Sequence, residues 1–142
     1  MTVELKELIK AAMGARAKAY ARYSNHPVGA AILADDGKIY AGCNVENAAY
    51  PLGFCAEANA IGNMVMGQGK AIRHIVIAGP GEHLCTPCGG CRQQIREFAG
   101  KAGAPVTIVD RTGAVLLETT SADLLPHSFG PENLSSEGKD HE

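Results

Sequence analysis

The sequence is poor in aromatic residues and in net charge. Its 142 residues include no Trp, 4 Tyr and 3 Phe, and 13 basic side chains stand against 15 acidic ones, giving a formal net charge of -2. Domains that bind nucleic acid carry a strong basic patch, so this balance argues for a small substrate and against a nucleic-acid partner. No apolar run reaches the length of about 20 residues that a membrane helix needs, and we expect no membrane association.

The cysteines are few, and their spacing matters more than their number. Three of the five, at positions 85, 88 and 91, are three residues apart, which is typical of metal ligands rather than of a disulfide framework. Because free thiols suit a reducing compartment and the N-terminus lacks the features of a signal peptide, we expect a cytoplasmic protein. The length predicts a single domain over residues 1–134, followed by a polar tail, 135–142, that we expect to be disordered.

Two short stretches carry the chemistry. One is Cys55-Ala56-Glu57, and the other, 86–93, contains Cys88 and Cys91. Each is typical of a turn that opens a helix, and a helix N-terminus favours a thiolate. A catalytic zinc ion takes three protein ligands and keeps its fourth position for water. The order Cys-x-Glu and then Pro-Cys-x-x-Cys resembles the signature of zinc-dependent nucleobase deaminases, and this resemblance implies Cys55, Cys88 and Cys91 as the ligands. Glu57, two residues after the first ligand, is the predicted proton carrier.

A closed structural metal site is the alternative. Cys85 precedes Cys88 by three residues, so that with Cys55 four thiolates are available, and the spacing also resembles the start of a bacterial ferredoxin run. Pro87 biases the preceding residue toward extended backbone, which would carry Cys85 away from the metal and leave it as a buried free thiol. A closed site would also leave Glu57 without a role, so we favour the catalytic interpretation.

Hydrophobic periodicity and turn residues predict the secondary structure. The predicted helices span 3–21, 55–66 and 89–99, and the predicted strands span 28–34, 38–43, 74–78, 105–110 and 114–118. The Asp-Gly pair at 36–37 predicts a hairpin, and Ser121 is expected to cap a short turn. This order predicts an α/β domain in which helices cover a mixed five-stranded sheet, with right-handed parallel crossovers.

Several segments resemble one family, the small homotetrameric zinc-dependent cytidine deaminases, over residues 23–134. The order Cys-Ala-Glu and then Pro-Cys-x-x-Cys is shared by zinc-dependent nucleobase deaminases in general. The segment Asn44-Val45-Glu46-Asn47 and the ending Leu-Leu-Pro-x-x-Phe at 124–129 are more specific to this family. The matching segments are 23–24, 28–31, 42–48, 55–57, 87–93 and 124–131. The resemblance implies a catalytic domain with a three-layer α/β/α fold around the mixed sheet.

The resemblance also implies roles at the reaction centre. One zinc ion per chain would be held by Cys55, Cys88 and Cys91, with Glu57 as the proton shuttle and Arg92 helping to neutralise the thiolates. The implied reaction is the hydrolytic deamination of cytidine or 2'-deoxycytidine to uridine or 2'-deoxyuridine and ammonia, in pyrimidine salvage.

The implied substrate contacts come from other parts of the chain. Asn44 and Glu46 would hold the ribose 3'-hydroxyl, and the backbone amide of Ala56 would meet the pyrimidine carbonyl oxygen. Phe129 would come from a neighbouring subunit of a homotetramer and help to close the pocket, so that active sites are shared. Tyr50 would lie near a subunit boundary.

Two positions depart from the family pattern. His26 stands where the family usually has a Phe that packs beside the substrate base, and Ala58 stands where the three-cysteine form usually has an Arg. His26 keeps open an alternative activity on a modified cytosine nucleoside such as blasticidin S, although Asn44 and Glu46 favour an ordinary ribose. A non-catalytic four-cysteine metal module is the alternative of another class, and release of ammonia separates it from the enzymes.

Overall fold

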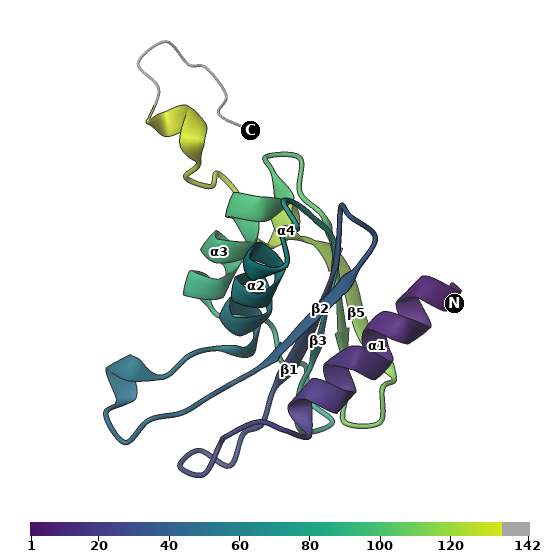
Figure 1. The fold of residues 1–142 in the computed structure, drawn as a ribbon, viewed down its shortest axis with the longest axis vertical. Helices are drawn as coiled ribbons and strands as arrows, with labels where there is room; N and C mark the ends of the chain where they lie inside the picture. Colours follow the sequence, from purple (N-terminus) through teal and green to yellow (C-terminus); the bar gives the residue numbers. More distant parts are fainter. Residues whose placement is uncertain (135–142) are drawn as a thin grey trace.

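A mixed five-stranded sheet, with the strand order β2-β1-β3-β4-β5, runs through the middle of the protein (Figure 1). The computed structural model describes residues 1–134, and the predicted disordered tail lies outside these described residues. Strands β3 and β4 are parallel, and the other neighbouring pairs are antiparallel. The strands are β1 Gly29–Ala34, β2 Ile39–Cys43, β3 Ile72–Ala78, β4 Pro105–Val109 and β5 Val115–Thr120.

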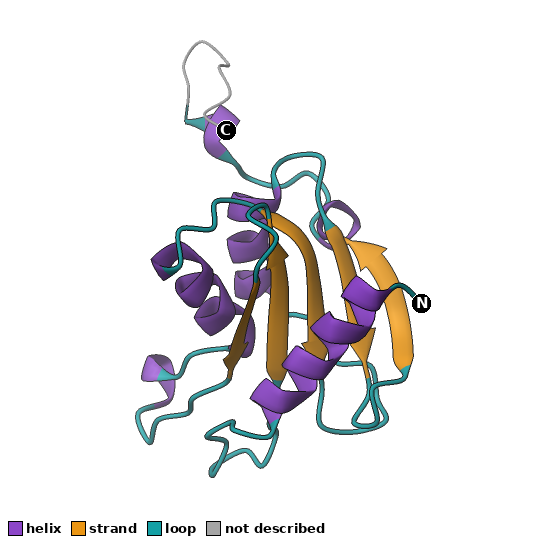
Figure 2. Cartoon of the chain, turned by 45° about the vertical axis from the view of Figure 1, so that its right-hand side comes forward, coloured by secondary structure: helices purple, strands orange, loops and turns teal. Residues whose placement is uncertain are grey.

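Helices cover both faces of this sheet (Figure 2). Helix α1 (Val3–Arg16) packs on one face, and helices α2 (Ala56–Met66) and α3 (Gly89–Ala99) pack on the other. A short helix, α4 (Ser121–Leu124), follows β5. The predicted three-layer α/β/α arrangement is therefore confirmed. Within residues 1–134, no helix combines the length and the apolar character needed to cross a membrane.

The alternating side chains of the central strands build two apolar cores. Ile75 and Ile77 of β3 face α2 and α3, whereas Val76 and Ala78 face α1. Because a central strand of this kind is buried on both faces, its sequence is a continuous apolar run without alternation. This explains the apolar run at 75–78.

Helix α1 is shorter than predicted, because it ends at Arg16 rather than near residue 21. The residues that follow pair with a distant loop. The backbone amide of Tyr20 donates to the carbonyl oxygen of Asn44 at 3.0 Å, and the carbonyl oxygen of Tyr20 accepts from the backbone amide of Glu46 at 2.8 Å. Arg16 itself donates to the carbonyl oxygens of Gly79 (2.7 Å) and Arg111 (2.8 Å), fixing the end of the helix on the loops after β3 and β4. Backbone pairing between distant segments overrides the local helical periodicity here.

The C-terminal half of the sheet also differs from the prediction in detail. Strand β5 continues to Thr120, and it is the Thr120 hydroxyl that caps α4 by accepting from the amide of Asp123 at 3.1 Å. The predicted cap, Ser121, instead accepts a hydrogen bond from the amide of Ala104 at 2.9 Å. The prediction of Ser121 as the cap was therefore wrong by one residue, although Thr120 is also a favoured cap type. Strand β5 ends two residues later than its apolar pattern predicted.

Helix α2 lies directly against strand β2 at Gly42. A Cβ at this position would lie 2.8 Å from the carbonyl oxygen of Ala56 and closer still to the amide nitrogen of Ala60. The absence of a side chain at Gly42 therefore lets the first turn of α2, which carries Glu57, approach the sheet.

Gly42→Ala is expected to lower the free energy of unfolding by about 1–3 kcal/mol, the usual cost of overpacking a close contact. Gly62→Ala is the matched control, because Gly62 lies in α2 and a Cβ there meets nothing within 4 Å. Alanine should stabilise that helix by about 0.5–1 kcal/mol relative to glycine. Urea denaturation of both variants measures the two changes, and equal stabilities would contradict the close approach of α2 to β2.

Candidate metal centre and active site

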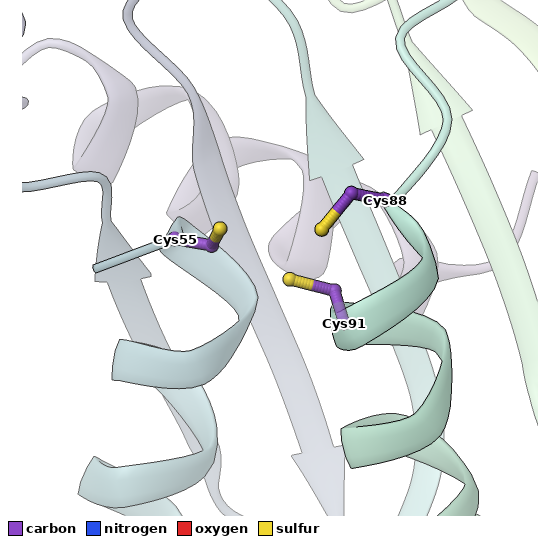
Figure 3. Close-up of side chains that lie close together, drawn as sticks. All are labelled: Cys55, Cys88 and Cys91. Atoms are coloured by element: carbon purple, nitrogen blue, oxygen red, sulfur yellow. The ribbon is translucent and has the colours of Figure 1, made fainter. Parts of the chain in front are cut away.

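Two helix N-termini meet at one edge of the sheet and bring three cysteines together (Figure 3). Strands β2 and β3 both run antiparallel to β1, and their last residues, Cys43 and Ala78, flank Gly29 from its two sides. The loops that follow these strands therefore leave the sheet at neighbouring points. One loop leads to Cys55, immediately before α2, and the other leads to Cys88, immediately before α3.

The three thiols form a set that a zinc ion fits. The Sγ atoms of Cys55, Cys88 and Cys91 all lie within 4.8 Å of one another, and the three sulfurs point toward a common space. Three sulfurs at the usual Zn–S distance of about 2.3 Å in tetrahedral geometry lie about 3.8 Å apart. Cys91 is buried, whereas Cys55 and Cys88 are exposed, so the set is closed on the protein side and open toward solvent. This is the arrangement expected of a catalytic site rather than a closed structural one.

The protein environment shifts the pKa values of the three thiols in different directions. Burial raises the pKa of Cys91 and of Cys55. At the N-terminus of α3, hydrogen bonding from the amide of Cys91 lowers the pKa of Cys88. A divalent cation favours the thiolate forms of all three, because ligation requires deprotonated sulfur.

Glu57 lies in the first turn of α2 and is 5% exposed. Burial raises the pKa of its carboxyl group above the ordinary value, and hydrogen bonds from its own backbone and from Cys91 oppose this shift in part. A carboxyl group whose pKa is raised toward neutrality can both accept and return a proton. Its position beside the thiol set fits the predicted role of proton carrier.

Cys85 lies outside the thiol set. Its side chain packs against the core beneath α2 and α3, and burial raises the pKa of its thiol. Its Sγ lies 3.7 Å from Nε2 of His26. Among the described residues, the metal-binding group contains three cysteines, as the catalytic interpretation predicts.

Asn44 braces the loop that carries His26. Its Oδ1 accepts from the amide of Val28 at 2.9 Å, and its Nδ2 donates to the carbonyl oxygen of His26 at 3.0 Å. The side chain therefore fixes the backbone on both sides of Pro27. His26 is held beside Cys85 by this bracing.

Glu46 engages the same loop from the other direction. Its Oε1 accepts from the amides of Tyr23 (2.9 Å) and Ser24 (3.0 Å), and its Oε2 accepts from the Ser24 hydroxyl. The hydroxyl bond from Ser24 is the main reason that the pKa of Glu46 is lowered. Ser24 is a site residue to which the sequence analysis gave no role. The sequence signal for this residue is the Tyr-Ser pair at 23–24, which matches the family pattern.

A cavity of about 340 Å³ lies beside Glu46 and is bounded by Tyr50. Tyr50 is 78% exposed, so its ring forms a wall that solvent reaches from outside. The remaining lining comes from Tyr23, Ser24, Asn47 and Gly53. The structure thus brings two of the predicted substrate residues, Glu46 and Tyr50, to one hollow.

Arg92 connects the loop before α3 to the last residue of α4. Its Nε donates to the carbonyl oxygen of Pro87 and its Nη1 to that of Leu124, both at 2.8 Å. Arg92 therefore fixes the loop that leads to Cys88, and its effect on the thiolates stays a prediction. No local sequence pattern indicates these two carbonyl partners.

A fold with helices on both faces of a mixed sheet, and with three cysteines at two helix N-termini beside a buried carboxyl group, defines a zinc-dependent deaminase-type domain. Residues 2–104 match the family described as the cytidine and deoxycytidylate deaminase zinc-binding region. The chain belongs to this family.

Individual relatives support the same assignment. The chain is 41% identical over 133 residues to a cytidine deaminase of Sporosarcina psychrophila, covering 94% of this chain and 96% of that protein. The crystal structure of cytidine deaminase from Burkholderia pseudomallei is 42% identical, with a TM-score of 0.81, covering 91% of this chain and 100% of that one. The corresponding structure from Mycobacterium tuberculosis is 35% identical, with a TM-score of 0.76, covering 91% and 99%.

Proposed function

We propose that this protein is a zinc-dependent enzyme that deaminates cytidine and 2'-deoxycytidine to uridine and 2'-deoxyuridine in pyrimidine salvage. The observation that carries the proposal is the set of Cys55, Cys88 and Cys91, within 4.8 Å of one another and adjoining the buried Glu57 at the starts of α2 and α3. Family membership supports the reaction class.

The residues of the chain supply binding, orientation and proton transfer. When bound, zinc supplies the Lewis acidity that makes water a nucleophile at neutral pH. Glu57 takes a proton from the attacking water and passes it to the ring nitrogen. It then takes the proton of the new hydroxyl group on C4 and passes it to the departing amine, so that C4 keeps a carbonyl oxygen and ammonia leaves. The amide of Ala56, in the first turn of α2, has no acceptor within the helix and binds the pyrimidine carbonyl oxygen.

The sugar is bound by residues next to the His26 loop. Asn44 and Glu46 hold the 3'-hydroxyl, Tyr50 bounds the hollow beside Glu46, and His26 lies beside the base. The bracing of residues 23–28 by Asn44 and Glu46 supports this proposal, because it keeps the loop fixed before a ligand arrives.

This assignment predicts a strong dependence on the 3'-hydroxyl. A hydrogen bond to a charged group such as the Glu46 carboxylate contributes about 1.5–3 kcal/mol, so 3'-deoxycytidine should have a specificity constant about 10- to 150-fold below that of cytidine. Free cytosine should be poorer still, whereas 2'-deoxycytidine is the control that keeps the 3'-hydroxyl. Loss of cytosine-ring absorbance and release of ammonia measure all four compounds. Comparable specificity constants for cytosine and cytidine would overturn the sugar assignment.

A modified cytosine nucleoside such as blasticidin S is the second candidate substrate. The observation that favours it is His26, whose imidazole near Cys85 offers a polar group where the family usually has Phe. Adding this compound to the same substrate panel tests the alternative directly. A higher specificity constant for the modified nucleoside than for cytidine would reassign the substrate, and release of no ammonia from any of them would favour a metal module.

The proposed working form is a cytoplasmic homotetramer. Three exposed aromatic or aliphatic side chains, Tyr50 (78%), Leu52 (61%) and Phe54 (60%), lie in one loop near the sugar site, and Phe129 is also exposed. Exposed apolar side chains grouped in this way favour an interface with other chains. In the tetramer, Phe129 closes the pocket of a neighbouring subunit and Tyr50 lies at the boundary.

A further inference from the structure

The C-terminal segment 128–132, which we call the strap, is bound along helix α3. Gln93 of α3 donates through Nε2 to the carbonyl oxygen of Phe129 at 2.9 Å. Three residues further along the helix, Arg96 donates through Nε to Oγ of Ser128 at 3.0 Å and through Nη2 to Oε1 of Glu132 at 2.6 Å. Helix α3 therefore binds the first two residues of the strap and its last residue.

The Arg96–Glu132 ion pair is largely removed from water, with side-chain exposures of 5% and 23%. A buried ion pair often stabilises a fold no better than packed apolar side chains of similar volume, because both charges lose hydration. Its geometric specificity is what such a pair adds here. A Cβ on Gly130 would overlap the Arg96 guanidinium, so the strap backbone rests directly on the ion pair.

Phe129 is the residue whose position these contacts determine. Its carbonyl group is bound, and its neighbours Ser128 and Gly130 are fixed by Arg96, yet its side chain is 55% exposed. The buried guanidinium of Arg96 thus holds the residues on either side of Phe129 while the Phe129 ring stays outside the core. Figure 1 shows this C-terminal region projecting from the body of the protein beyond α3.

We propose that Arg96, through its ion pair with Glu132, is a positioning residue that presents the Phe129 ring to the pyrimidine site of a second copy of the chain. This inference rests on the proposed function, because the site that receives the ring is the one that binds cytidine. Arg96 itself touches neither substrate nor metal in this proposal, and acts by setting where the ring lies.

The kinetic test uses Arg96→Gln and the milder Glu132→Gln, each alone and combined with Phe129→Ala, in the zinc-loaded full-length protein. Each single variant should raise KM for cytidine about tenfold and leave kcat within about twofold, as loss of a base–aromatic contact would. When Phe129→Ala is already present, the same substitutions should add less than about twofold, because they act through the ring. Arg111→Gln is the matched control, since Arg111 forms an exposed ion pair with Glu82 at 3.4 Å, and it should change neither constant.

A second readout does not depend on activity. The sequence contains no Trp, so Phe129→Trp introduces a single fluorescent reporter at the ring position. Its fluorescence anisotropy should fall when Arg96→Gln or Glu132→Gln is added, and stay unchanged with Arg111→Gln. Arg96→Lys should retain part of the anisotropy that Arg96→Gln loses. Lysine keeps the charge that pairs with Glu132, but it lacks the guanidinium that bonds Ser128 and Glu132 together.

The outcomes separate the two hypotheses. A wild-type protein that does not deaminate cytidine would overturn the proposed function, and the anisotropy would still report whether Arg96 fixes the strap. Equal KM effects with and without Phe129→Ala, or an anisotropy that ignores Arg96 and Glu132, would overturn the positioning role. Should Arg96→Gln fail to fold, Glu132→Gln decides by the same criteria.

Discussion

Replacement of Glu57 by Gln is expected to leave zinc bound at about one ion per chain while lowering the turnover of cytidine by about 10²–10⁴, the usual contribution of a general acid-base group. The amide has nearly the same shape as the carboxyl group, so it should fit the same buried site at the start of α2. It cannot accept and return a proton, and that is the function proposed for Glu57. Zinc content and turnover should be measured on the same preparation.

Glu97→Gln is the matched control for this experiment, because Glu97 is an exposed carboxylate on α3. It should keep both zinc and activity. Near-normal turnover in Glu57→Gln would remove this residue from the mechanism, whatever the metal content. Loss of zinc along with activity would instead show that the carboxyl group supports the thiol set and not the proton transfer.

Cys91→Ser is expected to lower the bound zinc from about one ion per chain to near zero, with loss of activity. A hydroxyl group is a much weaker ligand than a thiolate for this metal, and Cys91 is the buried member that closes the protein side of the set. Metal analysis after gel filtration measures the stoichiometry. Circular dichroism checks that the fold remains.

Cys85→Ser provides the control, from the loop that leads into α3. Cys85 is three residues from Cys88, but its sulfur lies outside the thiol set and contacts His26 instead. This variant should keep its zinc. A comparable loss of zinc from the Cys85 and Cys91 variants would support the alternative of a closed structural site with four cysteine ligands.

Those parts of the site that depend on local signals were predictable from the sequence. Cys55 and Cys88 stand at the N-caps of α2 and α3 as expected, and Gly100 ends α3 with a positive φ of 78°. Asp36 and Gly37 form the predicted hairpin turn, where Gly37 has a φ of 80°. Caps, turns and i, i+3 spacings involve residues that are close in the chain, so their consequences can be worked out without the fold.

The partners of the polar side chains depend on contacts between distant segments and could not be predicted in this way. The Asn44 side chain binds the backbone on both sides of Pro27, and Arg92 binds the carbonyl oxygen of Leu124, 32 residues away. The early end of α1 has the same origin, since Tyr20 pairs with the backbone of residues 44 and 46 and is not part of the helix. No periodicity records such pairings, because they exist only once the sheet has brought the segments together.

The separation between the thiol set and the apolar cores has a consequence for how the protein matures. Neither core cluster includes the sulfurs of Cys55, Cys88 or Cys91, and two of these cysteines remain open to solvent. Small zinc-finger domains, by contrast, are unfolded without their metal. Here the polypeptide is expected to complete its folding first and to acquire its ion afterwards, as a separate last step. A cell short of zinc would then hold a reserve of folded, inactive protein that becomes active as soon as the metal is supplied.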